Sequence, residues 1–484
     1  MDPLCTLPAT RLAEMVRARE VSARALVEAH ASQIAKANPS INALVALRLD
    51  AARAEADAAD ARLARGDDDL PPFFGVPCTI KEAFALEGMP WTSGLVARKE
   101  MKALGDATAV ARLRAAGAIP LGVTNTSELC MWFESFNRVY GRTTSAYDPS
   151  RIAGGSSGGE GAAVGSGMSP FGLGSDVGGS IRLPAFFNGV FGHKPSGGLV
   201  PNTGQYPSPT GTAGRMLSTG PLCRSARDLY PLLRVLAGPD GEDAWAEPLA
   251  LHDPAEVALR GLTVWDVRPS ESFGLRFDDD LVALQDRAVR ALASRGCRVV
   301  STTLPALRDA FEVWSAAMYD GNAVSFAQLL GGARPMTPLR ALAEVPRVLG
   351  GRSPHTLAAV GLALFEDLPR LMPARLAQMR DRRAELGGTL TDLLGRDGVM
   401  IVPTYPRVSP RHHEPLAQFP GAGVTGIVNA LALPSTAVPG GLDAQGRPLG
   451  LQVVGPHGGD ALCLAAALAL EDALGGWVPP PRWS

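Results

Sequence analysis

The stretch from Gly154 to Ala185, GGSSGGEGAAVGSGMSPFGLGSDVGGSIRLPA, is rich in glycine and serine, yet it differs from a flexible linker. A linker has polar flanks and no apolar segments. This stretch contains GAAVGSGM, which is typical of a closely packed small-residue helix, and PFGLGSD, which can be buried. It then continues into the apolar LPAFFNGVF. We therefore predict a rigid, buried wall whose glycines allow the backbone to hold serines for chemistry.

Nucleotide binding is disfavoured for this stretch. It contains no GxxxxGK[ST] sequence, and no GxGxxG follows a predicted strand. The whole chain has 46 basic and 48 acidic residues and a net charge of -2, which argues against a nucleic-acid partner.

Length and composition indicate a large folded protein. The 484 residues are 46% hydrophobic, enough for a sizeable core. Six cysteines without CxxC spacing indicate free thiols of a reducing compartment, with no disulfide framework and no metal site. The start, MDPLCTLPATRLAEMV, lacks the pattern of a signal peptide, and no window is apolar enough for a transmembrane helix. We expect a soluble, cytoplasmic protein.

Helical and strand patterns alternate along the chain. Helices are predicted after a Ser22 cap and over 49–66, and a buried strand is predicted to end near Lys81. Further strands are predicted over 118–123 and near 262, 297 and 398. We predict an α/β fold in one domain over 1–484: a central mixed β-sheet flanked by helices on both faces, with N-terminal helices over 1–70 and a catalytic core over 71–230.

The segment 333–380 is helical and apolar but interrupted by prolines. Two interpretations are open for it: a helical cap over the site, or an ordinary peripheral pair of helices.

Ser180, in DVGGSIR, is a candidate nucleophile. The two preceding glycines let successive backbone N–H groups turn toward one point and form an anion nest. Amide hydrolysis needs such donors for the oxyanion. The candidates are the N–H groups of Val177, Gly178, Gly179 and Ser180.

The base that would activate this serine is predicted to be a lysine. Lys81 closes the apolar GVPCTIK, where desolvation would lower its pKa and leave part of it neutral. The histidines in suggestive contexts, His193, His412 and His413, are weaker candidates, since an isolated histidine is more often structural. An exposed lysine capping a strand end is the alternative for Lys81.

Three elements in order, TIKEAF, GGSSGGEGAA and GSDVGGSIRLPA, resemble the amidase signature enzymes. Lys81 stands 75 residues before Ser156, and Ser180 stands 24 residues after it, which matches the family's spacing. TNTSELCMWFESFNRVYGRT, IRLPAFFNGVFGHKPS and PRHHEPL resemble the fatty-acid amide hydrolases, especially the second vertebrate type. The likeness spans about Phe73 to Val478. It is weak over 333–380, and the membrane-spanning start of the vertebrate enzymes has no counterpart here.

The resemblance implies a Ser–cis-Ser–Lys triad that needs neither cofactor nor metal. Ser180 would be the nucleophile, Ser156 the bridging serine after a cis peptide bond from Gly155, and Lys81 the neutral base. Ser157, Asp176 and Arg182 would support the surrounding loops.

The implied activity is hydrolysis of small-molecule amides with an apolar acyl or aryl part through an acyl-enzyme, with esters and carbamates (urethanes) open to the same chemistry. Cys130 and Met131 are candidate substrate contacts. The aromatic residues near the site belong to a pocket or to the core: Trp132, Phe133, Phe186 and Phe187.

The alternative function is the glutaminase subunit of a tRNA-dependent amidotransferase. A degenerate binding protein is disfavoured because all three triad positions are intact. A homodimer is an open alternative to a monomer.

Overall fold

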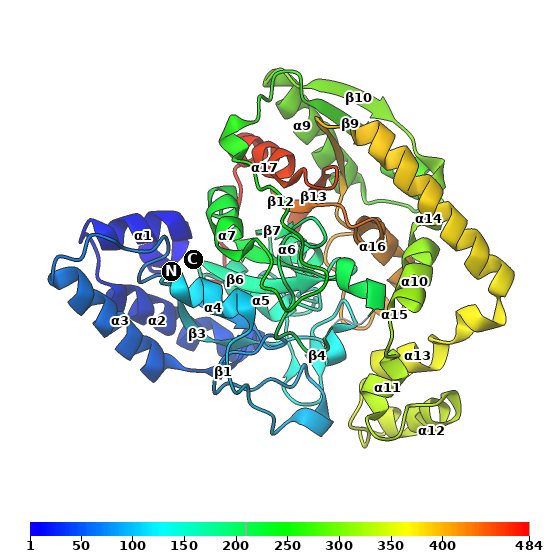
Figure 1. Cartoon of the computed structure of the whole chain (residues 1–484), viewed down its shortest axis with the longest axis horizontal. Coiled ribbons are helices and arrows are strands. Elements are labelled where there is room, and N and C mark those ends of the chain that lie inside the picture. Colours follow the sequence, from blue (N-terminus) through cyan, green and yellow to red (C-terminus); the bar gives the residue numbers. More distant parts are fainter. Residues whose placement is uncertain (209–210, 484) are drawn as a thin grey trace.

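One mixed β-sheet runs through the computed structural model, which describes residues 1–208 and 211–483 (Figure 1). In those residues the sheet has eleven strands in the order β1-β3-β2-β6-β8-β7-β12-β13-β11-β9-β10. They are β1 (Leu44–Leu47), β2 (Pro77–Lys81), β3 (Ile119–Thr124), β6 (Phe171–Asp176), β7 (Phe191–Lys194), β8 (Ser218–Cys223), β9 (Thr263–Val267), β10 (Arg298–Thr302), β11 (Gly398–Pro403), β12 (Ser435–Leu442) and β13 (Pro448–Val454). A separate ribbon joins β4 (Phe136–Asn137) and β5 (Gly141–Arg142).

The strands that carry the predicted site lie side by side and run in the same direction. β2 pairs in parallel with β3 on one side and with β6 on the other. Lys81 ends β2, Thr124 ends β3 and Asp176 ends β6. Because the carboxyl ends of parallel strands meet at one edge of a sheet, these three residues are brought to the same edge.

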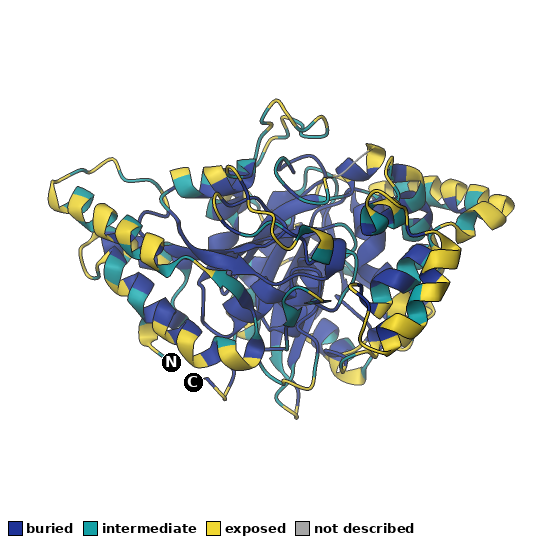
Figure 2. Ribbon diagram, turned by 90° about the horizontal axis from the view of Figure 1, so that it is seen from below, coloured by how far each residue is buried: buried dark blue, intermediate teal, exposed yellow. Residues whose placement is uncertain are grey.

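Helices flank the sheet, so the predicted α/β fold with a central mixed sheet is confirmed (Figure 1). They are α1 (Ala9–Arg17), α2 (Ala23–Ile41), α3 (Leu49–Ala64), α4 (Thr108–Ala115), α5 (Gly158–Gly165), α6 (Arg182–Phe187), α7 (Leu229–Leu236), α8 (Pro269–Phe273), α9 (Asp279–Ser294), α10 (Ala310–Gly321), α11 (Phe326–Gly331), α12 (Pro338–Leu349), α13 (Leu357–Phe365), α14 (Pro373–Leu394), α15 (Pro415–Gln418), α16 (Gly423–Ala430) and α17 (Asp460–Leu474). Figure 2 shows the sheet buried at the centre and the outer helices exposed at both ends.

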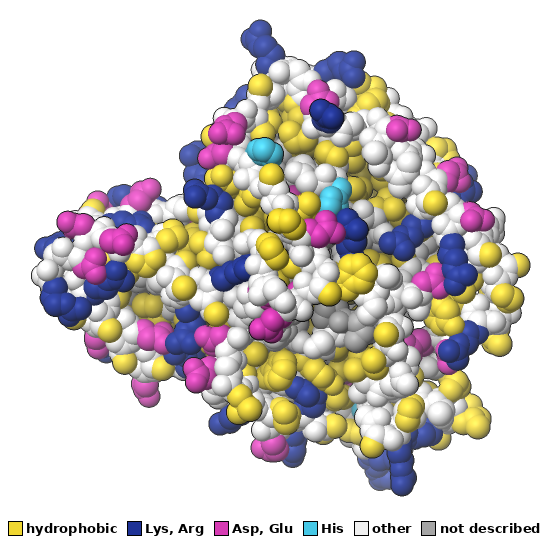
Figure 3. All heavy atoms as spheres, in the orientation of Figure 1, with side chains coloured by type: hydrophobic (Ala, Val, Ile, Leu, Met, Phe, Trp, Pro, Cys, Tyr) yellow, Lys and Arg dark blue, Asp and Glu magenta, His cyan; other side chains and the backbone are white. Residues whose placement is uncertain are grey.

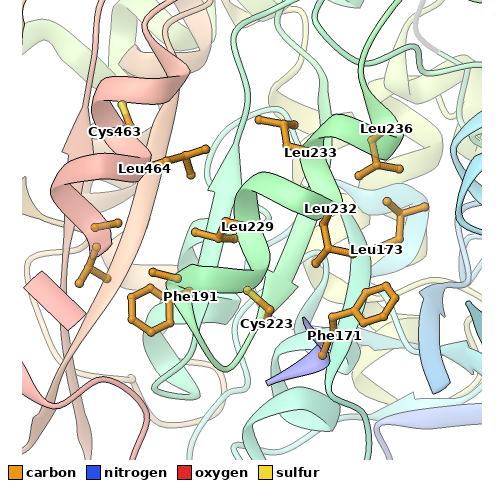
Figure 4. Close-up of a cluster of buried hydrophobic side chains, with 14 of the residues drawn as sticks. Phe171, Leu173, Phe191, Cys223, Leu229, Leu232, Leu233, Leu236, Cys463 and Leu464 are labelled. Atoms are coloured by element: carbon orange, nitrogen blue, oxygen red, sulfur yellow. The ribbon is translucent and has the colours of Figure 1, made fainter. Parts of the chain in front are cut away.

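The alternation of side chains along β6 separates the helices on the two faces of the sheet. Gly172 faces Glu160 of α5, where only glycine leaves room for the helix to approach, and a Cβ on Gly174 would meet Leu222, Ser157 and Ile181. Phe171 and Leu173 point the other way, into a core with Leu229 and its neighbours on α7 (Figure 4). A small-residue helix therefore packs closely on one face, and large apolar side chains fill the other.

Most predicted elements are present. Ser22 caps α2, where its hydroxyl accepts a hydrogen bond from the N–H of Ala25. The predicted strands over 118–123 and near 262, 297 and 398 correspond to β3, β9, β10 and β11, and the segment 333–380 is helical. The hairpin of β12 and β13 was not predicted, because its proline and glycine residues hide the strand pattern.

No helix within 1–208 and 211–483 combines the length and apolar character needed to cross a lipid bilayer.

Leu232→Ala tests the packing of α7 against the sheet. Leu232 is fully buried, so we expect the free energy of unfolding to fall by about 2 to 5 kcal/mol in denaturant titrations. Leu104→Ala is the matched control, because Leu104 is 98% exposed and its truncation should change stability by less than about 0.5 kcal/mol. Equal effects of the two substitutions would contradict the assigned core.

Candidate active site

Lys81 and Ser156 form the centre of the site. Both side chains are buried, and the Lys81 Nζ donates a hydrogen bond of 2.7 Å to the Ser156 Oγ. A second hydrogen bond of 3.0 Å joins the same Nζ to the Ser175 Oγ, a residue that the sequence did not single out. The peptide bond between Gly155 and Ser156 is cis.

The surroundings of Lys81 disfavour its charged form. Burial lowers the pKa of Lys81 below its ordinary value, although Cys130, Asp176 and Glu160 act in the opposite direction. A buried amine with a lowered pKa has a larger neutral fraction at neutral pH and can accept a proton. The alternative of an exposed lysine at a strand end is therefore wrong.

Ser180 is more exposed than Lys81 and Ser156. Lys81 and Ser156 are buried, whereas Ser180 is partly exposed. The N–H of Ser157 donates a hydrogen bond of 3.2 Å to the Ser180 carbonyl, and the Ser157 hydroxyl donates one of 3.2 Å to the Ser175 carbonyl. Ser157 thus connects the loop of Ser180 to the end of β6 and the segment of Ser156.

The backbone of the 177–180 loop is oriented through its carbonyl groups. Trp314 Nε1 donates a hydrogen bond of 2.8 Å to the Val177 carbonyl, and the Gly179 carbonyl accepts one of 2.7 Å from the N–H of Leu183. In a trans peptide the N–H points opposite the carbonyl. These two contacts therefore direct the N–H groups of Gly178 and Ser180 to the opposite side, away from Trp314 and α6.

One of the four predicted amide donors is already occupied. The N–H of Gly179 donates a hydrogen bond of 2.7 Å to the Asp176 carboxylate, while Thr425 Oγ1 holds the Gly178 carbonyl at 2.7 Å. The φ of Gly179 is 125°, a conformation that favours glycine. Among the described residues, the N–H groups of Val177, Gly178 and Ser180 donate to no protein acceptor. The prediction for Gly179 thus differs from the structure, because its N–H already donates to Asp176.

A buried ion pair holds both ends of this loop. Arg182 Nη2 lies 3.0 Å from Asp176 Oδ1, and both side chains are inaccessible to solvent. Although burial opposes ionisation, the charge and hydrogen bonds of Arg182 keep the pKa of Asp176 well below its usual value. The rest of the guanidinium is bonded to Gln452 and to Thr425 and Asn429 of α16. The residues just before and after Ser180 are therefore fixed to the same buried network.

Cys130 and Met131 lie at the end of a short 3-10 helix, Glu128–Cys130. Both are partly exposed. The Cys130 thiol interacts with Lys81 and lies 3.3 Å from Thr126 Oγ1. Met131 lines a cavity and packs in one hydrophobic cluster with Val177, the first residue of the loop before Ser180.

That cavity has a largely apolar lining. Its walls include Met131, Trp132, Phe136, Leu357, Ala359 and Leu416, with Glu134 and His413 among the polar residues. The carbonyl of Trp132 packs on Gly155, 2.5 Å from the place that a Cβ would occupy. The cavity wall is thus in direct contact with the segment that carries Ser156.

The helical segment predicted over 333–380 is anchored beside this cavity. Glu128 accepts hydrogen bonds of 2.8 Å from His355 Nδ1 and from the N–H of Thr356, just before α13. Helices α11 to α13 share a hydrophobic cluster with Leu129 and Met131. Hydrophobic side chains also reach the surface where α12 lies (Figure 3). The segment therefore adjoins the cavity.

The histidine candidates have other surroundings, and His413 lines the cavity. His193 is buried between Thr436 and Asp460, and His412 is bonded to Glu134. Phe186 and Phe187 are core residues, so the pocket interpretation is wrong for these two.

Arg182→Leu tests the buried ion pair. Removing one partner leaves Asp176 charged and unpaired in a dry environment, and we expect the free energy of unfolding to fall by about 3 to 5 kcal/mol in denaturant titrations. Arg227→Leu is the control, since the Arg227–Asp472 pair is exposed and should contribute less than about 1 kcal/mol. A comparable small loss at both positions would refute the assigned role of Arg182.

Comparison with known proteins identifies the family of this chain. A family model described as "Amidase" matches residues 25–464. Human fatty-acid amide hydrolase 2 is 43% identical, over 100% of this chain and 92% of its own length. A glutamyl-tRNA(Gln) amidotransferase subunit from Roseiflexus castenholzii is 32% identical, over 94% of this chain and 93% of its own. The solved structure of a 6-aminohexanoate cyclic dimer hydrolase superposes with a TM-score of 0.80 at 27% identity, covering 100% of both chains. The chain therefore belongs to the amidase signature family of amide-hydrolysing enzymes.

Proposed function

We propose that this enzyme is a serine hydrolase that cleaves amides with an apolar acyl or aryl part through an acyl-enzyme on Ser180. The observation that carries the proposal is the hydrogen bond of 2.7 Å between the buried Lys81 Nζ and the Ser156 Oγ, next to the partly exposed Ser180. This arrangement supplies a route for the proton that Ser180 must lose before it can attack a carbonyl carbon.

In the proposed acylation, the Ser180 Oγ attacks the amide carbonyl and its proton passes to the Ser156 Oγ. Ser156 gives its own proton to the neutral Lys81 amine, which becomes an ammonium. The proton then returns through Ser156 to the leaving nitrogen as the C–N bond breaks. Water, activated along the same route, hydrolyses the ester on Ser180.

The oxyanion formed in each step would be stabilised by backbone amides of the 177–180 loop that have no acceptor among the described residues. We assign this role to the N–H groups of Val177, Gly178 and Ser180, without Gly179. Each such donor typically lowers the barrier by about 3 kcal/mol. Because Trp314 and the first turn of α6 already orient the loop, little reorganisation would be needed during the reaction.

The apolar part of the substrate is assigned to the cavity next to Met131. Its lining is mostly hydrophobic, and its wall packs on Gly155 beside Ser156. The name of the human relative, fatty-acid amide hydrolase 2, supports a long apolar acyl group. The helical segment over 333–380 would act as a cap on this side. Esters and carbamates of similar shape are further candidate substrates, since they form the same acyl-enzyme or its carbamoyl counterpart.

A second candidate function is that of the glutaminase component of an amidotransferase. Two glutamyl-tRNA(Gln) amidotransferase relatives are 32% and 30% identical, over 94% and 97% of this chain. The apolar cavity favours the first function. Glutamine hydrolysis that appears only with added partner proteins would favour the second.

The triad variants test the proposal. The purified enzyme should hydrolyse members of a panel of anilides, long-chain amides, short amides, esters and carbamates. The released amine or alcohol is measured by chromatography. Ser180→Ala and Lys81→Met should each lower kcat/KM by about 10³-fold or more, because the nucleophile or the proton acceptor is lost.

Lys102→Met is the control for Lys81→Met, since Lys102 is exposed and should leave turnover unchanged. Near-normal activity of Lys81→Met at neutral pH would show that another group is the base.

Met131→Ala tests the assigned acyl pocket. The shortened side chain loses apolar contact in the cavity, so we expect the ratio of kcat/KM for a long-chain amide over an acetyl amide to fall by about tenfold. Met101→Ala, at an exposed methionine, should leave that ratio unchanged. An equal loss of activity on both substrates would place the acyl chain elsewhere.

A further inference from the structure

A fully buried carboxylate lies against β2, the strand that ends at Lys81. Glu160 belongs to α5 and follows Ser156 by four residues. Its Oε2 accepts a hydrogen bond of 2.6 Å from Thr79 Oγ1, and its Oε1 accepts one of 2.7 Å from Thr124 Oγ1. Both hydrogen bonds are buried, so solvent does not compete for them.

The two threonines belong to the same face of the sheet as Lys81. Thr79 precedes Lys81 by two residues on β2, and Thr124 is the register partner of Lys81 on β3. Residues two apart on a strand, and residues directly paired across strands, share a face. The carboxylate of Glu160 is therefore bonded to two neighbours of Lys81 on that face, one on the same strand and one on the adjacent strand.

Glycine at position 172 leaves the space that the Glu160 carboxylate occupies. Gly172 of β6 is the register partner of Thr79, and a Cβ there would collide with the Glu160 carboxylate. Glycine weakens a strand interior, so its presence here is explained by the space it leaves for the carboxylate. Figure 1 shows α5 beside β6, in the position that this close approach requires. The seat thus consists of two hydroxyl donors and a glycine.

Few charges surround this seat. Among the described residues, no arginine, lysine or histidine lies within salt-bridge distance of Glu160. The cation that interacts with it is Lys81, and the thiol whose pKa it raises is that of Cys78. The other groups that act on Lys81 are Cys130 and Asp176, and Asp176 is already paired with Arg182.

We propose that Glu160 is a positioning residue for the proposed amidase reaction: its carboxylate, held by Thr79, Thr124 and the gap at Gly172, supplies the countercharge for the Lys81 ammonium that forms during acylation. This inference rests on the proposed function of Lys81 as the base.

The physical reason is the cost of a buried charge. During acylation Lys81 gains one proton from Ser156 in a fully buried environment, where an unpaired ammonium is strongly disfavoured. Asp176 cannot offset this new charge fully, because its own charge is already neutralised by Arg182. The ionised Glu160 adds to the effects of Cys130 and Asp176 on Lys81, and it acts through space without touching the substrate.

Burial favours the neutral form of Glu160, as it does for Lys81. It raises the pKa of Glu160 to about 8, against the opposing effects of Thr79, Thr124 and Lys81. Near neutral pH the carboxyl group can thus exist in either form. To act as a countercharge, Glu160 must be ionised while Lys81 is still neutral, because the proton that Lys81 gains in acylation comes from Ser156 and not from Glu160.

Glu160→Gln tests the inference in the full-length enzyme through the pH dependence of kcat and kcat/KM for the best substrate of the panel. The negative charge raises the proton affinity of Lys81, so its removal lowers the pKa of Lys81. We expect the acidic limb of kcat/KM to move to lower pH by about one unit. We also expect kcat on the plateau to fall by about tenfold with KM nearly unchanged, because the ammonium loses its countercharge.

Asp228→Asn is the matched control. Asp228 is another buried carboxylate, bonded to Ala9 and Thr10 at the start of α1, far along the chain from the Lys81 strand. Its replacement should reduce stability and leave the pH of the acidic limb unchanged. Thr79→Val is the second variant: losing one donor disfavours the ionised Glu160, so the limb should move in the same direction by a smaller amount.

The outcomes separate the two proposals. A wild-type enzyme without hydrolase activity would overturn the proposed function and this inference with it. An active wild type with acidic limbs that coincide for wild type, Glu160→Gln and Thr79→Val would overturn the role of Glu160 alone. If Glu160→Gln does not fold, an unshifted limb for Thr79→Val overturns that role by itself.

Discussion

The burial of the Lys81 amine is the constraint on which the rest of the site depends. A lysine in water is charged and useless as a base at neutral pH, and only a dry environment makes the neutral amine abundant. Lys81 ends an interior strand with β3 and β6 on either side, and its burial there lowers its pKa. The same environment makes every neighbouring polar contact costly to leave unsatisfied, and the hydroxyls of Ser156 and Ser175 satisfy the amine.

Around this amine the fold keeps the loop of Ser180 rigid by holding it from outside. The hydrogen bonds from Trp314 and Thr425 fix its carbonyl groups, and the Asp176–Arg182 pair fixes its two ends. The contacts come from α10 and α16, more than a hundred residues further along the chain. A glycine-rich backbone can be rigid in this way because its neighbours, and not its own side chains, determine its conformation.

The sequence predicted the parts of this arrangement that lie in short motifs. The strand ending at Lys81, the positions of Ser156 and Ser180 and the helix after GGSSGG follow from local patterns and from the resemblance to one family. Ser175, Trp314 and Glu160 were not singled out, because their roles depend on contacts between distant segments. No local pattern indicated that Asp176 would take the N–H of Gly179, since that contact depends on the turn of the loop in space.

The most direct test of this mechanism is the rate at which an alkyl fluorophosphonate modifies Ser180, followed by intact mass and peptide mapping from about pH 5 to about pH 10. This reaction needs the proton route through Ser156 and Lys81 and involves no leaving amine. We expect modification at Ser180 with a rate that rises with pH to a plateau, with a midpoint well below the ordinary lysine value of 10.5. A rate that is independent of pH, or that still rises without a plateau at the highest pH measured, would contradict a neutral buried Lys81 as the base.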